Sequence, residues 1–185
     1  GHKPDPIIFR DMKPSNVMIN HNGDVVLVDF GIAKTFQSGQ KGTMIGTEGY
    51  SPPEQYRGEA TPLADIYSLG ATLHHAITRR DPRLEPPFSF AERPIRRINP
   101  NVSMEFEAVV NTALQYNPND RFSSTAAMKD ALLNVARKTG TLDKVAAALP
   151  VSSGGVKPLW TFKCEDEIRG TPALHQGMLF IGCYD

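Results

Sequence analysis

The sequence predicts an α+β fold that is mainly helical, with short antiparallel strands near its beginning and again near its end. Apolar runs lie on both sides of Asn22-Gly23, and Asn-Gly between such runs is the strongest local signal for a β-hairpin. Between residues 61 and 137, apolar residues recur at the three- and four-residue spacing of buried helices. After residue 158, alternating apolar positions separated by Gly and Pro indicate short strands once more.

The composition narrows the class of protein. The 185 residues include 20 basic and 20 acidic side chains, so the formal net charge is zero. Proteins that bind nucleic acid by releasing counterions are normally basic, so that class is disfavoured. At about 150 residues per domain, the length allows one domain and part of a second. No apolar run approaches the roughly 18 residues needed to cross a bilayer.

Four polar side chains flank the predicted hairpin. Asp11, Lys13 and Asn16 precede its first strand, and Asp29 follows its second, so the hairpin brings them together. The oxygens of Asn16 and Asp29 suit a magnesium ion. Lys13 is a point charge suited to a transferring phosphoryl group, and Asp11 can accept a proton from a hydroxyl. The cluster therefore predicts the catalytic floor of a phosphotransferase.

These motifs resemble those of a known family. Residues 9–16, which read FRDMKPSN, and residues 29–31, which read DFG, resemble the catalytic loop and the magnesium loop of the eukaryotic-type protein kinases, which also occur in bacteria. Phe30 and Gly31 would be structural parts of the magnesium loop. Phe9 stands where the family usually has His, and because this position packs mainly against the magnesium loop, the departure affects packing more than chemistry.

The resemblance implies a role for each polar residue. Asp11 would be the base that orients the substrate hydroxyl, and Lys13 would steady the γ-phosphate of ATP. Asn16 and Asp29 would hold Mg²⁺. Because Lys13 lies two residues after Asp11, the motif is similar to that of the serine/threonine branch rather than the tyrosine branch.

By the same resemblance, residues 29–54 form the activation segment. Residues 46–50, which read GTEGY, are similar to the family's G-T-x-x-Y, in which the threonine helps to position the catalytic Asp and Lys. Thr47 would therefore position Asp11 and Lys13. Residues 32–50 are rich in glycine and weakly periodic, so we expect no regular element there.

Three hydroxyl residues in the activation segment, Thr35, Ser38 and Thr43, are candidate phosphorylation sites. Arg10, adjacent to the base, would give such a phosphate a bidentate partner and would so order the loop. The alternative is that these hydroxyls are merely solvated.

Other motifs have structural roles in the family. The predicted helices cover residues 61–78, 104–116 and 124–137. In the first helix, Asp65 begins a DIYSLG sequence that resembles the signature of the family's central helix, where this residue ties down the backbone of the catalytic loop. Arg121 would pair with Glu54 at the end of the activation segment. His74 and His75 lack a matching ligand pair nearby, so we interpret them as ordinary helix residues rather than a metal site.

The resemblance and the composition together predict three parts. Residues 1–137 would be a protein kinase C-terminal lobe, residues 138–157 a linker in which residues 142–149 could form a short helix, and residues 158–185 one partial repeat of a quinoprotein-like (PQQ-type) β-propeller. The repeat is indicated by three alternating segments and by Trp160 and Gly182. Cys164 and Cys183 could form a disulfide, although two thiols in a chain of this length are more often free.

Both ends of the sequence look incomplete for such an arrangement. The kinase resemblance begins at the catalytic loop, so we expect the N-terminal lobe, which clamps the nucleotide, to be missing. One propeller repeat cannot close a ring, so we also expect the chain to be cut short at its end. The 185 residues are therefore not expected to phosphorylate efficiently by themselves.

The sequence thus predicts a serine/threonine protein kinase in signal transduction, which transfers the γ-phosphoryl group of MgATP to protein hydroxyls in the cytoplasm. Its partners would be protein substrates with Ser or Thr acceptors and a ligand or protein bound by the propeller. One alternative is a pseudokinase-like scaffold without phosphotransfer, which the intact polar cluster disfavours. Another is that the propeller carries the main activity, as in cofactor-dependent dehydrogenases.

Overall fold

The structure, a computed structural model, describes residues 7–20, 23–30, 34–35, 46–59, 61–141, 173–175 and 178–180. The strands at 34–35, 173–175 and 178–180 are described by their backbone. The chain divides into two compact units, residues 1–149 and residues 150–185. None of the helices in the described ranges is long and apolar enough to cross a membrane.

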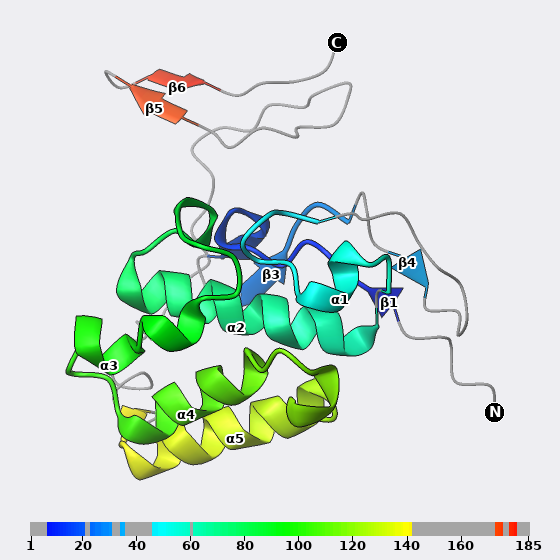
Figure 1. The fold of residues 1–185 in the computed structure, drawn as a ribbon. Coiled ribbons are helices and arrows are strands. Elements are labelled where there is room, and N and C mark those ends of the chain that lie inside the picture. The colour runs from blue at the N-terminus through cyan, green and yellow to red at the C-terminus, as the bar shows by residue number, and fades with distance from the viewer. Residues whose placement is uncertain are drawn as a thin grey trace, which may run out of the picture. The chain divides into compact units, whose positions relative to one another are not determined.

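The elements of the first unit follow one another in the order strands, then helices (Figure 1). They are β1 (Ile7–Ile8), β2 (Val17–Ile19), β3 (Val25–Leu27), β4 (Lys34–Thr35), α1 (Pro53–Tyr56), α2 (Pro62–Thr78), α3 (Ile95–Ile98), α4 (Met104–Ala113) and α5 (Thr125–Lys138). Single 3₁₀ turns at Pro14–Asn16, Pro82–Leu84, Phe90–Glu92 and Pro118–Asp120 connect them.

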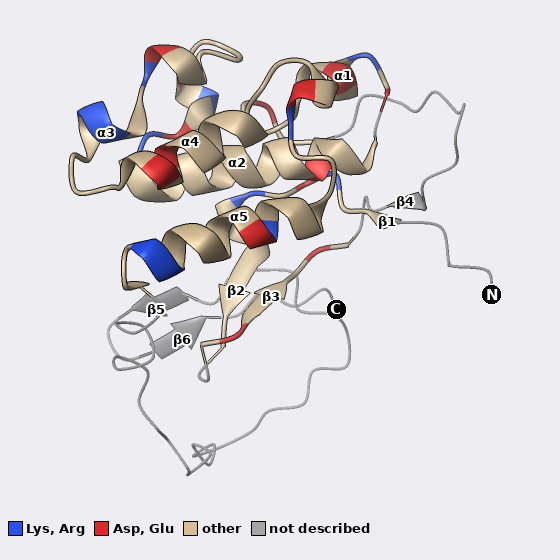
Figure 2. Cartoon of the chain, turned by 90° about the horizontal axis from the view of Figure 1, so that it is seen from below, with Lys and Arg blue, Asp and Glu red and all other residues tan. Residues whose placement is uncertain are grey.

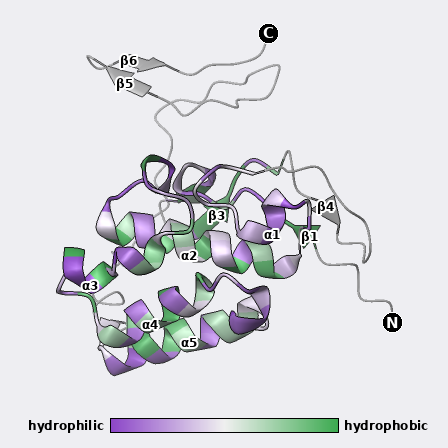
Figure 3. Cartoon of the chain, in the orientation of Figure 1, coloured by the Kyte–Doolittle hydropathy of each residue, from purple (hydrophilic) through white to green (hydrophobic). Residues whose placement is uncertain are grey.

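The predicted hairpin is confirmed. Strands β2 and β3 pair antiparallel with Val17 opposite Leu27 and Ile19 opposite Val25. The turn is closed by Asn20, whose backbone N–H donates to the carbonyl oxygen of Asp24 at 3.0 Å. β3 is coloured hydrophobic in Figure 3, yet the side chains of Ile19 and Val25 are 71% and 65% exposed. The hairpin therefore places the flanking polar residues without burying its own apolar side chains in this unit.

The expectation of no regular element in residues 32–50 is wrong at one point. Lys34 and Thr35 form strand β4, which pairs antiparallel with β1. Ile7 lies opposite Thr35, and Ile8 lies opposite Lys34. Backbone hydrogen bonds alone define such a two-residue strand pair. Two residues are too few to show an alternating side-chain pattern in the sequence.

Helix α2 is the central helix of the unit. It lies above the α4–α5 pair in Figure 1, and its Ile66 joins a core cluster with Val109 and Met128 from those helices. The predicted bounds of α2 are confirmed. Thr61 occupies the N-cap position with extended backbone, but its hydroxyl makes no capping hydrogen bond in the described part of the chain.

The two later helices are also confirmed, with α5 shifted by one residue at each end and α4 shorter than predicted. Ser103 and Ser124 cap α4 and α5, because their hydroxyls accept hydrogen bonds from backbone N–H groups three residues on. Helix α4 ends at Ala113 rather than Tyr116. The backbone N–H of Gln115 bonds three residues back, to the carbonyl oxygen of Thr112, and Arg121 donates to the carbonyl oxygens of Gln115 and Tyr116 that follow the helix.

Among the described helices, α1, α2 and α4 carry only acidic side chains and α3 only basic ones, whereas α5 carries both signs (Figure 2). The equal numbers of acidic and basic residues in the whole sequence are therefore spread over different helices.

The second unit is described only through one strand pair. Strand β5 (Ala173–His175) pairs antiparallel with β6 (Met178–Phe180), with Ala173 opposite Phe180. Strand β5 overlaps the end of the second expected propeller segment, residues 168–174, and β6 lies within the third, residues 177–185. The expected first segment with Trp160, the helix at 142–149, and the pair Cys164 and Cys183 lie outside the described residues.

Candidate functional site

The backbone of the catalytic loop is held by α2. The carboxylate of Asp65 accepts hydrogen bonds from the backbone N–H groups of Phe9 and Arg10, both at 2.8 Å. The hydroxyl of Thr72, almost two turns further along the helix, donates to the carbonyl oxygen of Met12 at 3.3 Å. Asp65 therefore lies where the resemblance implies, and the loop before and after Asp11 is attached to one rigid helix.

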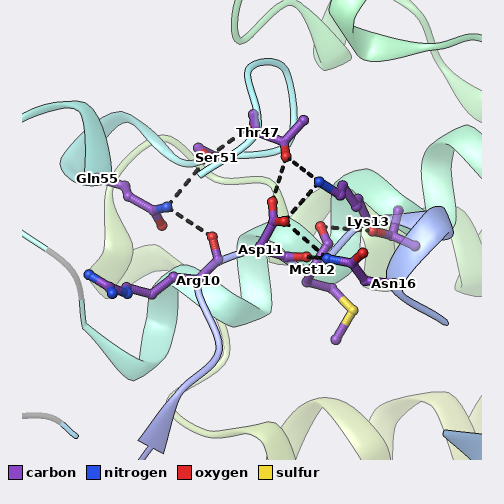
Figure 4. Close-up of polar contacts among 9 residues, drawn as sticks. Arg10, Asp11, Met12, Lys13, Asn16, Thr47, Ser51 and Gln55 are labelled. Carbon is purple, nitrogen blue, oxygen red and sulfur yellow. Dashed lines mark hydrogen bonds and ion pairs between the residues drawn. The ribbon is translucent and has the colours of Figure 1, made fainter. Parts of the chain in front are cut away.

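Asp11, Lys13 and Thr47 form a triangle of polar contacts (Figure 4). The ammonium of Lys13 lies 2.8 Å from Oδ2 of Asp11 and donates to Oγ1 of Thr47 at 2.9 Å. The Thr47 hydroxyl donates in turn to Oδ1 of Asp11 at 2.5 Å. The activation segment thus contacts both residues of the catalytic loop that the resemblance places at the reacting groups.

The surroundings of Asp11 keep its carboxyl ionised. Burial raises the pKa of Asp11, but hydrogen bonds from Lys13, Thr47 and Asn16, with the charge of Lys13, outweigh burial and hold this pKa below its usual range. Because a carboxylate of low pKa is a weak base, Asp11 is better suited to orient a hydroxyl than to remove its proton early.

Asn16 and Asp29 lie at the two ends of the hairpin. The backbone N–H of Val28 donates to the carbonyl oxygen of Asn16 at 3.0 Å. Asp29 is the next residue after Val28, so the hairpin brings it close to Asn16. Asn16 donates both hydrogens of its amide to Asp11, to the carbonyl oxygen at 2.9 Å and to Oδ2 at 3.0 Å. Its Oδ1 accepts no hydrogen bond from the described residues and remains an oxygen that could bind a metal.

Asp29 and Arg10 share an unusual backbone conformation. Their φ angles are 64° and 68°, in the left-handed region that non-glycine residues rarely occupy. Such conformations persist where surrounding structure enforces them, and they are concentrated at functional sites.

Phe30 contacts the residue that departs from the family pattern. The rings of Phe9 and Phe30 meet edge to face with centroids 5.1 Å apart. The substitution of Phe for His is therefore accommodated by an aromatic contact with the magnesium loop.

The phosphorylation candidates are only partly described. Thr35 lies in β4, of which the structure gives the backbone, and Gly31, Ser38 and Thr43 lie outside the described residues. Arg10 is 8% exposed, and in Figure 4 its side chain points away from the Asp11 carboxylate. Its predicted pairing with a phosphate remains a prediction.

Glu54 and Arg121 form the ion pair that the resemblance implies. Both terminal nitrogens of the Arg121 guanidinium donate to the carboxylate of Glu54, at 2.5 and 2.9 Å. The two side chains are 2% and 0% exposed. The end of the activation segment is therefore anchored in the helical core.

The imidazoles of the two histidines of α2 each make a polar contact with another segment of the chain. His74 is buried and its Nε2 lies 2.9 Å from the carbonyl oxygen of Arg93, whereas Nδ1 of His75 lies 2.5 Å from the hydroxyl of Tyr50. Among the described residues, no group of three or more His, Cys, Asp or Glu side chains could hold a metal ion.

Sequence reasoning missed Gln55, Ser51 and Thr72, which also contact this site. The Gln55 amide donates to the carbonyl oxygen of Arg10 at 3.0 Å, and the Ser51 hydroxyl donates to that of Thr47 at 3.1 Å. No local pattern marks these residues, because their partners lie far away or are backbone atoms. Ser51 and Gln55 had one signal, their position beside the Pro-Pro-Glu that ends the activation segment, and Thr72 had its position on the same face of α2 as Asp65.

Comparison with known proteins agrees with this geometry. The family model of the protein kinase domain matches residues 2–133. The chain belongs to the protein kinase family. Its catalytic loop, magnesium loop and central helix all lie within the matched residues of this kinase chain.

Curated bacterial kinases are similar to the same part of the chain. A probable serine/threonine-protein kinase of Corynebacterium efficiens is 38% identical over 140 residues, which is 66% of this chain and 21% of that protein. The serine/threonine-protein kinases PknB of Mycolicibacterium smegmatis and Mycobacterium tuberculosis are 37% and 38% identical over 143 residues, 70% of this chain and 23% of each relative. This kinase chain therefore spans less than a quarter of the length of these relatives.

Proposed function

We propose that the protein to which this chain belongs is a serine/threonine protein kinase and that residues 1–137 form the C-terminal lobe of its catalytic domain. The observation that carries the proposal is the triangle of Asp11, Lys13 and Thr47. It brings a carboxylate, an ammonium and a hydroxyl together from two segments that are more than thirty residues apart. A scaffold without phosphotransfer has no need for that arrangement.

In this proposal, Asp11 accepts a hydrogen bond from the Ser or Thr hydroxyl of a protein substrate and takes its proton as the phosphoryl group is transferred. Lys13 is 25% exposed, so its ammonium can contact the transferring group while it holds Asp11. Thr47 fixes the rotation of the Asp11 carboxylate. These residues act by positioning and by electrostatic stabilisation, the main components of phosphoryl-transfer catalysis.

The cofactor of this proposal is MgATP. The hard oxygen ligands that fit magnesium at this site are Oδ1 of Asn16, whose amide nitrogen is bonded to Asp11, and the carboxylate of Asp29. When bound, magnesium neutralises phosphate charge and orients the phosphate chain. Because Asn16 is also bonded to Asp11, it fixes the metal-binding oxygen relative to the base.

We further propose that Thr35, Ser38 or Thr43 is phosphorylated and that Arg10 pairs with the phosphate. Support comes from the place of Arg10, whose backbone is fixed by Asp65 immediately before the base. A phosphate held there would order the activation segment next to Asp11.

For residues 158–185 we propose the beginning of a quinoprotein-like β-propeller, which would bind a ligand or protein partner. The antiparallel pair of β5 and β6 is compatible with two strands of one blade. We place both parts in the cytoplasm, where ATP is available. A structure of the full-length protein with a closed ring of such blades would support this reading, and a different fold after residue 158 would overturn it.

The experiment that tests the kinase proposal is phosphate transfer from labelled ATP by the full-length protein, with phosphate mapped onto residues 32–47. We expect label on Thr or Ser that falls about 10²- to 10⁴-fold in Asp11→Asn. The matched control is Asp130→Asn on the exposed side of α5, which should leave transfer unchanged. If the folded wild-type protein transfers no phosphate to itself or to generic protein substrates with magnesium present, the scaffold alternative replaces this proposal.

A further inference from the structure

A single carboxamide joins the two segments that meet at Asp11. Gln55 follows the Glu54 of the activation segment and is 2% exposed. Its Nε2 lies 3.0 Å from the carbonyl oxygen of Arg10 and 3.4 Å from the hydroxyl oxygen of Ser51. Figure 4 shows the amide between these two groups, on the opposite side of Asp11 from Lys13.

We propose that Gln55 is a positioning residue, which holds the catalytic loop and the end of the activation segment in the register that lets Asp11 meet Thr47. The inference rests on the proposed kinase function and deepens it. Gln55 does not contact the reacting atoms and acts through its neighbours.

Each of the two contacts leads to Asp11 by a short route. The carbonyl of Arg10 and the backbone nitrogen of Asp11 belong to the same peptide group. A hydrogen bond to this carbonyl therefore also fixes the backbone position of Asp11. On the other side, the Ser51 hydroxyl donates to the carbonyl oxygen of Thr47 at 3.1 Å, and the Thr47 hydroxyl donates to Asp11. Gln55 therefore closes a ring of contacts that includes the base.

The chemistry of the bridge requires this type of side chain. A carboxamide nitrogen has two hydrogens and can donate to a carbonyl and a hydroxyl at once. A carboxylate of the same shape donates nothing, and asparagine is one methylene shorter. Because Gln55 lies in the interior, water cannot replace its hydrogen bonds to the Arg10 carbonyl and the Ser51 hydroxyl unless the surrounding structure rearranges.

Two backbone features indicate that the bridge is under steric and conformational constraint. A Cβ atom at Gly46 would lie 2.3 Å from both Nε2 of Gln55 and Oγ of Ser51, so only glycine leaves room for the contact. Arg10 has a φ of 68°, and both of its backbone groups are held, the N–H by Asp65 and the carbonyl by Gln55. A strained residue beside the base is thus fixed from two sides.

The test is residue-resolved amide hydrogen exchange of this chain in the wild type and in Gln55→Met, which keeps the length and removes both donors. We expect exchange about tenfold faster at Phe9 and Arg10 and also at Tyr50 and Ser51, whose N–H groups bond to Asp65 and Thr47 respectively. Exchange in α4 and α5 should not change. The matched control is Gln115→Met, because within the described ranges the exposed side-chain amide of Gln115 bonds to the Asn111 carbonyl alone, one helical turn away.

Two further variants keep the test decisive. If Gln55→Met does not fold, Gln55→Asn replaces it, because the shorter amide stays polar but cannot reach both partners. Gly46→Ala breaks the same bridge from the other side, so its effect on exchange should not add to that of Gln55→Met. Faster exchange confined to residues 51–57, or equal in all helices, would overturn the inference.

A kinetic measurement connects the bridge to catalysis. In the full-length kinase, Gln55→Met should lower kcat about tenfold and leave the KM for ATP within about twofold, because Gln55 fixes the base and not the nucleotide. An unchanged kcat in a variant with the altered exchange pattern would overturn the positioning role. If the wild type transfers no phosphate at all, the proposed kinase function fails, whereas the exchange result still decides whether Gln55 joins the two segments.

Discussion

Arg121 holds the carboxylate of Glu54 with both of its terminal nitrogens across 67 positions of sequence. The same guanidinium donates to three carbonyl oxygens, those of Leu63, Gln115 and Tyr116, and lies 4.9 Å from the centre of the Tyr67 ring. Each N–H group of the guanidinium therefore donates to an acceptor. The pair ties α1, the start of α2 and the turn after α4 to one point, and so fixes where the activation segment ends.

We expect Arg121→Met to destabilise the chain by about 3–5 kcal/mol, since it leaves the Glu54 carboxylate buried without its partner. The free energy of unfolding in urea measures this loss. The control is Arg137→Met, because Arg137 is exposed and its one side-chain hydrogen bond among the described residues is to Asn134, so its removal should cost less than about 0.5 kcal/mol. A cost for Arg121→Met as small as that of the control would show that the buried pair has no anchoring role.

The end of the activation segment also depends on a close backbone approach at Gly49. A Cβ atom there would lie 2.7 Å from the carbonyl carbon of Pro82, and the φ of Gly49 is 81°. Gly140 has a similar φ of 64° with nothing within 4 Å of its Cβ position. Gly140→Ala should therefore cost only the conformational strain, about 1–2 kcal/mol, whereas Gly49→Ala should cost more because Pro82 must also move. Urea unfolding of both variants measures the difference, and equal costs would refute the steric account.

The sequence predicted the hairpin, the helices and the polar residues around Asp11, because each has a local signal. Asn-Gly marks the turn, the three- and four-residue spacing marks α2, and the order of motifs marks the catalytic and magnesium loops. What the sequence could not reveal are contacts that need the folded chain. In the described part of the chain β4 pairs with the backbone of β1, and Arg121 binds carbonyl oxygens just beyond the end of α4. Gln55 reaches the Arg10 carbonyl across 45 positions.

His74 gives a pH dependence to stability. Burial lowers the pKa of its imidazole, as does the charge of Arg93, although the carbonyl of Arg93 and the carboxylate of Glu85 act in the opposite direction. A histidine whose pKa is lower in the folded state binds fewer protons there than in the unfolded state. Its contribution to stability is therefore complete above the unfolded pKa of about 6.5 and is lost as the pH falls through the folded value.

The measurement is the free energy of unfolding between pH 8 and pH 5 for the wild type and His74→Gln. Glutamine can still donate to the Arg93 carbonyl but does not titrate. We expect the wild type to lose stability relative to the variant below about pH 6.5, by at most about 1.4 kcal/mol per pH unit, the value for one proton. The control is His175→Gln in the second unit. If the free energy of unfolding of the wild type and of His74→Gln changed with pH in parallel, the pKa of His74 would be the same in the folded and the unfolded state.

Variants of Thr47 test whether its hydroxyl positions Asp11 or whether the side chain only packs. Thr47→Val keeps the shape of the side chain but removes the donor to Asp11 and the acceptor for Lys13, so the Asp11 carboxylate loses its fixed rotation. Because hydrogen bonds to charged groups contribute about 1.5–3 kcal/mol, we expect kcat of the full-length kinase to fall about 10- to 100-fold. Thr47→Ser, which keeps the hydroxyl, should stay within about threefold of the wild type.

The matched control for this series is Thr112→Val on α4, where the hydroxyl donates only to the Ala108 carbonyl of the preceding turn. If Thr47→Val retained wild-type kcat, Thr47 would be no more than a packing residue. Asp11 would then be oriented by Lys13 and Asn16 alone, whose contacts with its carboxylate at 2.8 and 3.0 Å come from within the catalytic loop. A catalytic loop that holds its own base would not depend on the state of the activation segment. A loss that serine rescues would instead place the control of Asp11 in the activation segment.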